Sequence, residues 1–297
     1  MSLFEYGGSS AIYSLNHFIV VKVPRSKDDD DEHTAEQVIF DIIESSKRHP
    51  NLVASYYRVQ SATFLEFAGL NLESMLQEHQ TRDPRTRRVL SVVEYPMDLL
   101  VRWKAEISGG SAWMEEVGLA HGDLRTENVV INDGHAKIID FGRSVKVGSP
   151  LEIGTEPFAR QTESGSYGLA GPVTEQFALG SILYCLAQGY KPYEDEWFGE
   201  DHNNILVEKL QKREFPILKD GPWEIVINCC WGGEFETVQK LHAHISSLAG
   251  QIKGAPLLDQ TTIDQRRAEC KKAVEEGLSS NKNPDNRSAY NARCKES

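Results

Sequence analysis

Apolar residues alternate with polar ones, or form short runs, in the first part of the chain, and this pattern is typical of β-strands. We expect strands at residues 3–6, 12–15, 18–23, 52–59 and 62–67. A loop of small residues at 7–11 separates the first two. The N-terminal part is therefore predicted to be rich in strands.

Longer segments carry apolar residues at steps of three and four, which predicts amphipathic helices. The first helix opens at Thr34, after a charged stretch at 26–33 that we expect to be a solvated loop. A basic stretch at 81–88 is also predicted to be a loop because of Pro84, with a docking patch for acidic substrates as the alternative. Further helices are expected at 71–79, from 96 or 97 to 117, and at 204–212, 223–230, 235–248 and 262–277.

A predicted hairpin in the middle of the chain carries the candidate chemistry. The apolar run 129–131 leads into the turn Asn132-Asp133-Gly134, which favours a two-stranded hairpin. Such a hairpin would bring Asp123, Asn128 and Asp140 to one end. A phosphoryl-transfer site needs an acceptor-orienting carboxylate, oxygen ligands for Mg²⁺ and positive charge on the nucleotide phosphates, and these residues supply the first two.

The sequence HGDLRTEN at 121–128, followed by DFG at 140–142, resembles the catalytic loop and the metal-binding element of protein kinases. The resemblance implies that Asp123 is the catalytic base and that Arg125 is the cation beside the transferred phosphoryl. It assigns Asn128 and Asp140 to Mg²⁺. Gly122 stands where the family has an arginine that contacts a phosphorylated activation loop, so activity independent of that phosphorylation is expected.

The same resemblance suggests ATP-binding residues in the strand-rich part. Lys22, in the run VVKV, is similar to the family's strand lysine that grips the α and β phosphates, and Glu36 would be its partner on the first helix. Gly8 and Ser9 lie in the small-residue loop that would cover the phosphates. Gly8 is the only residue there on a motif glycine, so an ordinary hairpin turn is the alternative.

The residues after the second strand pair correspond to the hinge of the family. Glu66 and Ala68 would hydrogen-bond an adenine ring through their backbone groups. The implied fold is α+β and bilobal, with a small β-rich lobe at 1–67 and a larger α-helical lobe at 70–252. A polar tail at 253–297 would hold one helix and a disordered end.

The substrate side departs further from the family pattern. Thr155 resembles the threonine at the end of the activation segment that ties to the catalytic aspartate. The usual A-P-E motif is not legible, and Glu163 competes with the register of 157–160 for its place. Glu175 replaces the aspartate that starts the central helix, and its longer carboxylate can still accept the backbone N–H groups of the catalytic loop.

Composition excludes several other classes of protein. The chain has 297 residues, 40% of them hydrophobic, and a formal net charge of −12, which disfavours nucleic acid or an anionic membrane as the partner. Five cysteines without a C-x-x-C pair indicate reduced thiols. With no signal-peptide pattern and no run of about 18 apolar residues, we expect a cytoplasmic, monomeric protein.

Three functions fit these features. The first is an ATP- and Mg²⁺-dependent serine/threonine kinase acting on a protein substrate. The second is a pseudokinase that binds ATP as a scaffold, which the thin glycine loop and Glu175 would suit. The third is a small-molecule kinase similar to aminoglycoside and choline phosphotransferases, which share the H-G-D pattern found at 121–123.

Overall fold

The smaller of two compact units in the chain is built on an antiparallel sheet. The computed structural model describes residues 2–6 and 9–277, and the described residues of this unit are those up to Asp30, Ser55–Phe67 and those from Leu258. Ile19, Val21 and Phe64 are almost completely buried in it, as expected for β-branched and aromatic residues of a central strand pair. The five strands, in sheet order, are β1 (Ser2–Tyr6), β2 (Ser10–Asn16), β3 (Ile19–Pro24), β5 (Ala62–Glu66) and β4 (Ser55–Val59).

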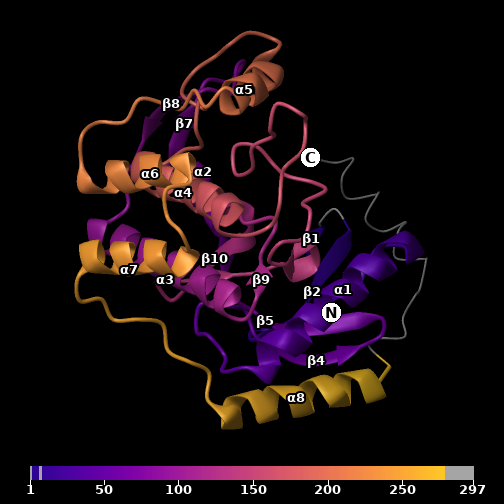
Figure 1. Ribbon diagram of the computed structural model, residues 1–297. Helices are drawn as coiled ribbons and strands as arrows, with labels where there is room; N and C mark the ends of the chain where they lie inside the picture. Colours follow the sequence, from indigo (N-terminus) through magenta and orange to yellow (C-terminus); the bar gives the residue numbers. More distant parts are fainter. Residues whose placement is uncertain (1, 7–8, 278–297) are drawn as a thin grey trace. The chain divides into compact units, whose positions relative to one another are not determined.

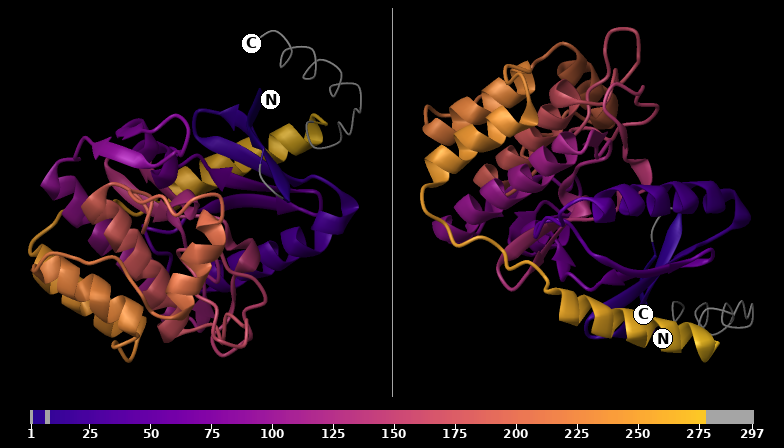
Figure 2. Two further views of the ribbon diagram at one scale, coloured as in Figure 1. Left: turned by 90° about the horizontal axis from the view of Figure 1, so that it is seen from above. Right: turned by 60° about the horizontal axis from the view of Figure 1, so that its bottom comes forward.

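Helix α8 (Gln260–Glu275) packs along β4 of this sheet (Figure 2). Its buried positions, Ile263, Cys270 and Ala273, form a narrow apolar stripe on an otherwise polar helix. Arg267 Nε donates a hydrogen bond of 3.1 Å to the carbonyl oxygen of Tyr56. The helix expected in the polar tail is therefore grouped with the strands of the smaller unit.

The larger unit, Asp31–Ala54 with Ala68–Leu257, is mainly helical. Helix α7 packs on α3 and α6 packs on α4 (Figure 1). The approach of α4 to α6 is close because a Cβ atom at Gly180 would lie only 2.7 Å from Cβ of Cys230. The helices are α1 (Asp30–Ser45), α2 (Leu72–Glu78), α3 (Met97–Glu116), α4 (Pro172–Gln188), α5 (His202–Gln211), α6 (Pro222–Gly232) and α7 (Val238–Ala249).

Short strands complete the larger unit. The hairpin of β10 (Val129–Asn132) and β11 (His135–Ile138) also pairs with β6 (Leu70–Asn71). Strand β9 (Leu119–Ala120) pairs with β12 (Val145–Lys146). Within residues 2–6 and 9–277, no helix has both the length and the apolar character needed to cross a membrane.

One charged stretch differs from the expected loop. The stretch 26–33 is instead a helical turn, η1 (Lys27–Asp29), that leads into α1. Ser26 begins it, with its backbone N–H and its hydroxyl both donating to Asp29 Oδ2. Acidic side chains suit the positive end of the helix dipole, which the solvated-loop prediction overlooked.

The basic stretch 81–88 is largely the expected loop, because residues 83–88 lie in no strand or helix. Strands β7 (Gln80–Arg82) and β8 (Val89–Val92) pair as a hairpin around it. Arg82 Nη2 lies 3.0 Å from Glu194 Oε2, so Arg82 forms an ion pair within the larger unit. Pro84 lies in the turn between the two strands, in agreement with the loop predicted from it.

Candidate functional site

The β10–β11 hairpin brings Asn128 and Asp140 to the same end. Val129 pairs with Ile138, and one residue further the backbone N–H of Ile139 donates to the carbonyl oxygen of Asn128 at 2.9 Å. Asp140 follows directly. The predicted hairpin is therefore present, and both candidate metal ligands lie just beyond the same end of its ladder, Asn128 before β10 and Asp140 two residues after β11.

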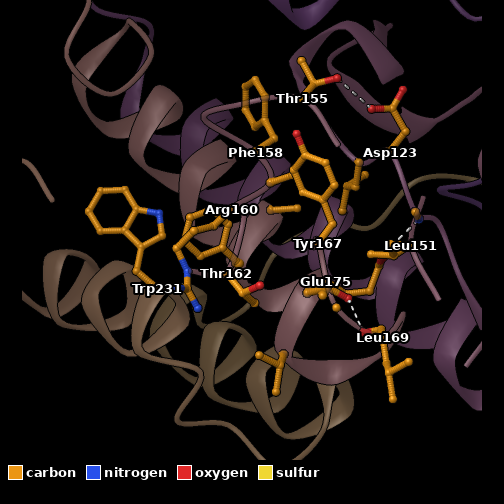
Figure 3. A pocket seen from close by; sticks show the side chains of 18 of the residues that line it. Asp123, Leu151, Thr155, Phe158, Arg160, Thr162, Tyr167, Leu169, Glu175 and Trp231 are labelled. Atoms are coloured by element: carbon orange, nitrogen blue, oxygen red, sulfur yellow. Dashed lines mark hydrogen bonds between the residues drawn. The ribbon is translucent and has the colours of Figure 1, made fainter. Parts of the chain in front are cut away.

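Asp123 joins this end of the hairpin through side-chain hydrogen bonds. Asn128 Nδ2 donates to the backbone oxygen of Asp123 at 2.8 Å and to its Oδ2 at 3.2 Å. Arg125 Nε donates to the same Oδ2 at 3.2 Å. Thr155 Oγ1 lies 3.5 Å from Oδ1, the contact expected for this threonine (Figure 3). The carboxylate is thus fixed from three directions while remaining partly exposed.

The amide nitrogen of Asn128 is used in these bonds, which leaves its carbonyl oxygen Oδ1 as the atom able to ligate a cation. Within residues 2–6 and 9–277 there is no cluster of three or more His, Cys, Asp or Glu side chains that could hold a metal. One carboxylate, Asp140, and one amide oxygen suit Mg²⁺, because this ion keeps several waters and binds substrate phosphates through one or two protein ligands.

The backbone at Asp140 has φ 64° and ψ 74°, a left-handed conformation that costs free energy in a non-glycine residue. The next residue, Phe141, is completely buried and stabilises it. The ring of Phe141 packs 5.3 Å from that of Phe40 on α1 and 5.8 Å from that of His121. Its backbone N–H also donates to Glu36 Oε1 at 3.2 Å. Helix α1 and the catalytic loop therefore hold Asp140 in place together.

Gly122 adopts φ +77°, and a Cβ atom here would lie 2.4 Å from the carbonyl oxygen of Arg143. The backbone therefore requires glycine at this position. Gly122 does more than remove the arginine that the family has here. Its N–H donates to Glu175 Oε1 at 3.1 Å, as predicted for the longer carboxylate. Burial raises the pKa of Glu175, although hydrogen bonds from the loop oppose this rise.

A charge network behind the catalytic loop was missed by the sequence interpretation. Lys191 Nζ lies 2.9 Å from Glu127 Oε1 and 3.0 Å from Glu73 Oε1. Thr126 Oγ1 donates to Glu73 Oε2 at 2.7 Å. Burial alone would raise the pKa of Glu127, but the ammonium of Lys191 outweighs it and lowers the pKa. The only signal in the sequence was that Glu73 and Glu127 had been given no basic partner.

The ATP-binding residues expected in the strand-rich part lie mainly in the smaller unit. Lys22 is buried on β3, and the carbonyl oxygen of Ser9 accepts from the N–H of Arg25 at 3.1 Å. Gly8 lies outside the described residues. Glu36 belongs to the larger unit, so its pairing with Lys22 stays a prediction.

The chain leaves the smaller unit and enters the larger one at the expected hinge. Glu66 ends β5, and the N–H of Phe67 donates to the carbonyl oxygen of Phe18 at 3.0 Å. Ala68 is the first residue of the larger unit in this segment. The adenine-binding role of Glu66 and Ala68 stays a prediction.

A pocket of about 320 Å³ lies beside Asp123 in the larger unit. Residues of the catalytic loop, the following segment and α4 line it (Figure 3). Arg160 and Arg213 are among them, and the sequence interpretation singled out neither. Glu163, the candidate for the A-P-E glutamate, is exposed. It lies in a turn in which the backbone N–H of Thr162 donates to the carbonyl oxygen of Ser166.

Comparison with known proteins adds an independent observation. The family described as "Protein kinase domain" matches residues 7–287. A segment covering 42% of the chain is 30% identical to the cAMP-dependent protein kinase catalytic subunit 3 of Drosophila melanogaster, of which it covers 22%. Sperm motility kinase 2A of Mus musculus is 35% identical over 32% of the chain and 18% of that protein.

Maternal embryonic leucine zipper kinase of Xenopus laevis is 27% identical over 38% of the chain and 18% of that protein. The chain thus spans about a fifth of the length of the curated relatives it matches.

Proposed function

Because this chain belongs to the protein kinase domain family, we propose that it transfers the γ-phosphoryl group of ATP to a serine or threonine hydroxyl of a protein. The observation that carries the proposal is the meeting of Asp123, Asn128 and Asp140 at one end of the β10–β11 hairpin. Phosphoryl transfer depends mostly on positioning and electrostatics, and these three residues are the polar groups that such positioning uses.

Asp123 would accept the proton of the substrate hydroxyl. Its carboxylate is oriented by Arg125, Asn128 and Thr155, so it need not reorganise when a hydroxyl arrives. The guanidinium of Arg125, already within 3.2 Å of Asp123, would place positive charge beside the transferred phosphoryl.

Asn128 and Asp140 would hold Mg²⁺, which neutralises charge on the nucleotide phosphates when it is bound. Lys22 would contact the α and β phosphates, with Glu36 as its partner. Gly8 and Ser9 would lie over the phosphates, and the backbone of Glu66 and Ala68 would receive the adenine. The buried position of Lys22 and the bond from Phe141 to Glu36 support the roles proposed for Lys22 and Glu36.

Two other functions remain candidates because of particular residues. Glu175 and the short glycine loop suit a pseudokinase that binds ATP without transfer. Gly122, which the backbone at φ +77° requires, matches the H-G-D pattern of small-molecule kinases. The family match to residues 7–287 favours a protein as the acceptor.

A transfer assay on the full chain separates the three functions. Purified protein is incubated with Mg²⁺ and γ-labelled ATP, with a mixed protein acceptor in one series and amino alcohols in another. Asp123→Asn is compared with the wild type and with Asp220→Asn, an exposed residue before α6. We expect labelled protein, and a loss of about a hundredfold or more in Asp123→Asn alone.

Thermal shift with Mg-ATP accompanies this assay. Stabilisation by Mg-ATP without transfer to either acceptor would select the pseudokinase. Transfer to an amino alcohol but to no protein would select the small-molecule kinase. Absence of both stabilisation and transfer would contradict the proposed function.

A further inference from the structure

The pocket beside Asp123 joins the candidate catalytic residue to a pair of arginines. In Figure 3, Asp123 and Thr155 lie at one side of the pocket, and Arg160, Thr162 and Trp231 lie at the other. Its volume of about 320 Å³ is that of a small-ligand site and can take one large side chain. A side chain bound here would therefore come from a molecule whose neighbouring part reaches Asp123.

Arg160 and Arg213 both line this pocket, and neither guanidinium forms an ion pair with any residue in the described part of the chain. Cζ of Arg160 lies 5.8 Å from the centre of the Phe177 ring, so one cation is set against an apolar wall. Burial, followed by the positive charge of Arg213, lowers the pKa of Arg160. Two like charges beside an apolar surface favour the arrival of an anion.

The two carboxylates that also line the pocket are engaged elsewhere. Asp123 accepts hydrogen bonds from Arg125 and Asn128. Glu175 is buried and accepts the N–H of Gly122. The positive charge of the arginines is therefore not neutralised from within the pocket.

We infer that this pocket binds a phosphoserine or phosphothreonine of the protein substrate, located within about three residues of the acceptor hydroxyl. The inference rests on the proposed function, because the substrate is what reaches Asp123. A phosphoryl group carries close to two negative charges and three strong acceptor oxygens, which matches two guanidinium groups with planar, forked donors. A glutamate would satisfy the same chemistry with half the charge and would bind more weakly.

The test uses peptides that differ in one residue. Each contains a single acceptor serine, with phosphothreonine, glutamate or glutamine at each of the three positions before and after it. Binding to the full chain is measured by fluorescence anisotropy, and phosphoryl transfer is measured with the same peptides. Mass spectrometry first establishes whether the protein itself carries phosphate on 162–167.

The variants are chosen to remove charge with little change in structure. Arg160→Met keeps an apolar stem against Phe177. Arg213→Asn suits the left-handed backbone at that residue, φ 59°, because asparagine tolerates it. The control is Lys212→Gln, which removes the adjacent exposed cation that pairs with Glu208 and does not line the pocket.

We expect the best phosphopeptide to bind about tenfold or more tightly than its glutamine counterpart, with glutamate between them. Arg160→Met and Arg213→Asn should each reduce this ratio, and the double variant should abolish it while binding the glutamine peptide as the wild type does. Lys212→Gln should keep the ratio. Equal binding of the phosphorylated and glutamine peptides, or a ratio that survives in the double variant, would overturn the inference.

The two proposals can fail separately. Transfer to the glutamine peptide reports the proposed kinase activity whether or not the pocket selects phosphate. A tenfold phosphopeptide preference in binding, without transfer to any peptide, would uphold the pocket and reject the activity. Phosphate found on residues 162–167 of the active protein, with a phosphopeptide preference that appears only after its removal, would show that the pocket serves the chain's own segment instead.

Discussion

Gly122 links backbone conformation to the candidate chemistry at the scale of single residues. Its N–H reaches Glu175, and the following residue, Asp123, faces Arg125 and Asn128. A side chain at Gly122 would meet the carbonyl oxygen of Arg143 at 2.4 Å. The position of the catalytic carboxylate therefore depends on the absence of a Cβ atom one residue before it.

We predict that Gly122→Ala lowers the free energy of unfolding by about 3 kcal/mol and impairs transfer, because alanine adds both a clash and left-handed strain. The matched control is Gly148→Ala, with φ +90° and no atom within 4 Å of the added Cβ. It should lose about 1 kcal/mol, since only the strain applies. Urea unfolding measures both variants. Equal losses in the two would argue against the clash.

The sequence shows some of these residue contacts and hides others. The meeting of Asp123, Asn128 and Asp140 could be predicted because a short hairpin has a defined register. The positive φ of Gly122 could not, since the family comparison draws attention only to a missing arginine. Arg160 and Arg213 come together through the packing of distant elements, which leaves no local pattern in the sequence.

At the scale of elements, His49 follows α1 and packs against two helices of the larger unit. Its ring centre lies 6.2 Å from that of Trp113 on α3. Burial, and then the nearby His242 on α7, lower the pKa of His49 from 6.5 to about 4. His242 in turn lies 3.0 Å from Ser108 Oγ of α3. The packing of α3 against α7 therefore favours the neutral form of both histidines.

This arrangement predicts acid sensitivity between pH 6.5 and about 4. Below pH 6.5 the unfolded chain protonates His49 while the folded chain does not, so stability is full above this pH and falls as the pH decreases. The shift corresponds to about 3 kcal/mol, which we halve to about 1.5 because the ring is partly exposed. His49→Asn should remove this part of the pH dependence in urea unfolding.

The exposed His17→Asn serves as the control and should keep the pH dependence of the wild type. A pH dependence that is unchanged in His49→Asn would contradict the assignment to this ring.

Helix α8 contributes to the smaller unit through few apolar residues. Ile263→Ala should destabilise this unit by about 2–4 kcal/mol, because Ile263 is 1% exposed and its removal leaves a cavity. Hydrogen exchange at the amides of β4 and β5 measures the effect locally. Exposed Thr261→Ala should change little. Unchanged exchange in Ile263→Ala would mean that α8 does not stabilise the sheet.

At the scale of the whole molecule, a strand-rich unit and a helical unit could both be predicted, because periods of two and of three to four residues are visible in the sequence. The membership of α8 in the strand-rich unit could not. Only Ile263, Cys270 and Ala273 of this helix are buried, and such a narrow stripe resembles a solvated tail.

Activity is expected to persist after phosphatase treatment. Asp123 is held by Arg125, Asn128 and Thr155, and none of these contacts requires a phosphorylated residue. The turnover number of dephosphorylated protein should stay within about twofold of the untreated protein, a difference of less than about 0.5 kcal/mol in activation free energy. Turnover that disappears on dephosphorylation would refute this expectation.

The most direct test of the account is the Mg²⁺ dependence of ATP binding, measured by calorimetry for the wild type, Asp140→Asn and Asp133→Asn. Asp133 lies at the opposite end of the same hairpin, and its left-handed backbone, φ 50°, accommodates asparagine. We predict Mg²⁺-enhanced binding in the wild type and in Asp133→Asn, and loss of the enhancement in Asp140→Asn. Enhancement that survives in Asp140→Asn, or is absent from the wild type, would contradict a magnesium nucleotide site at this end of the hairpin.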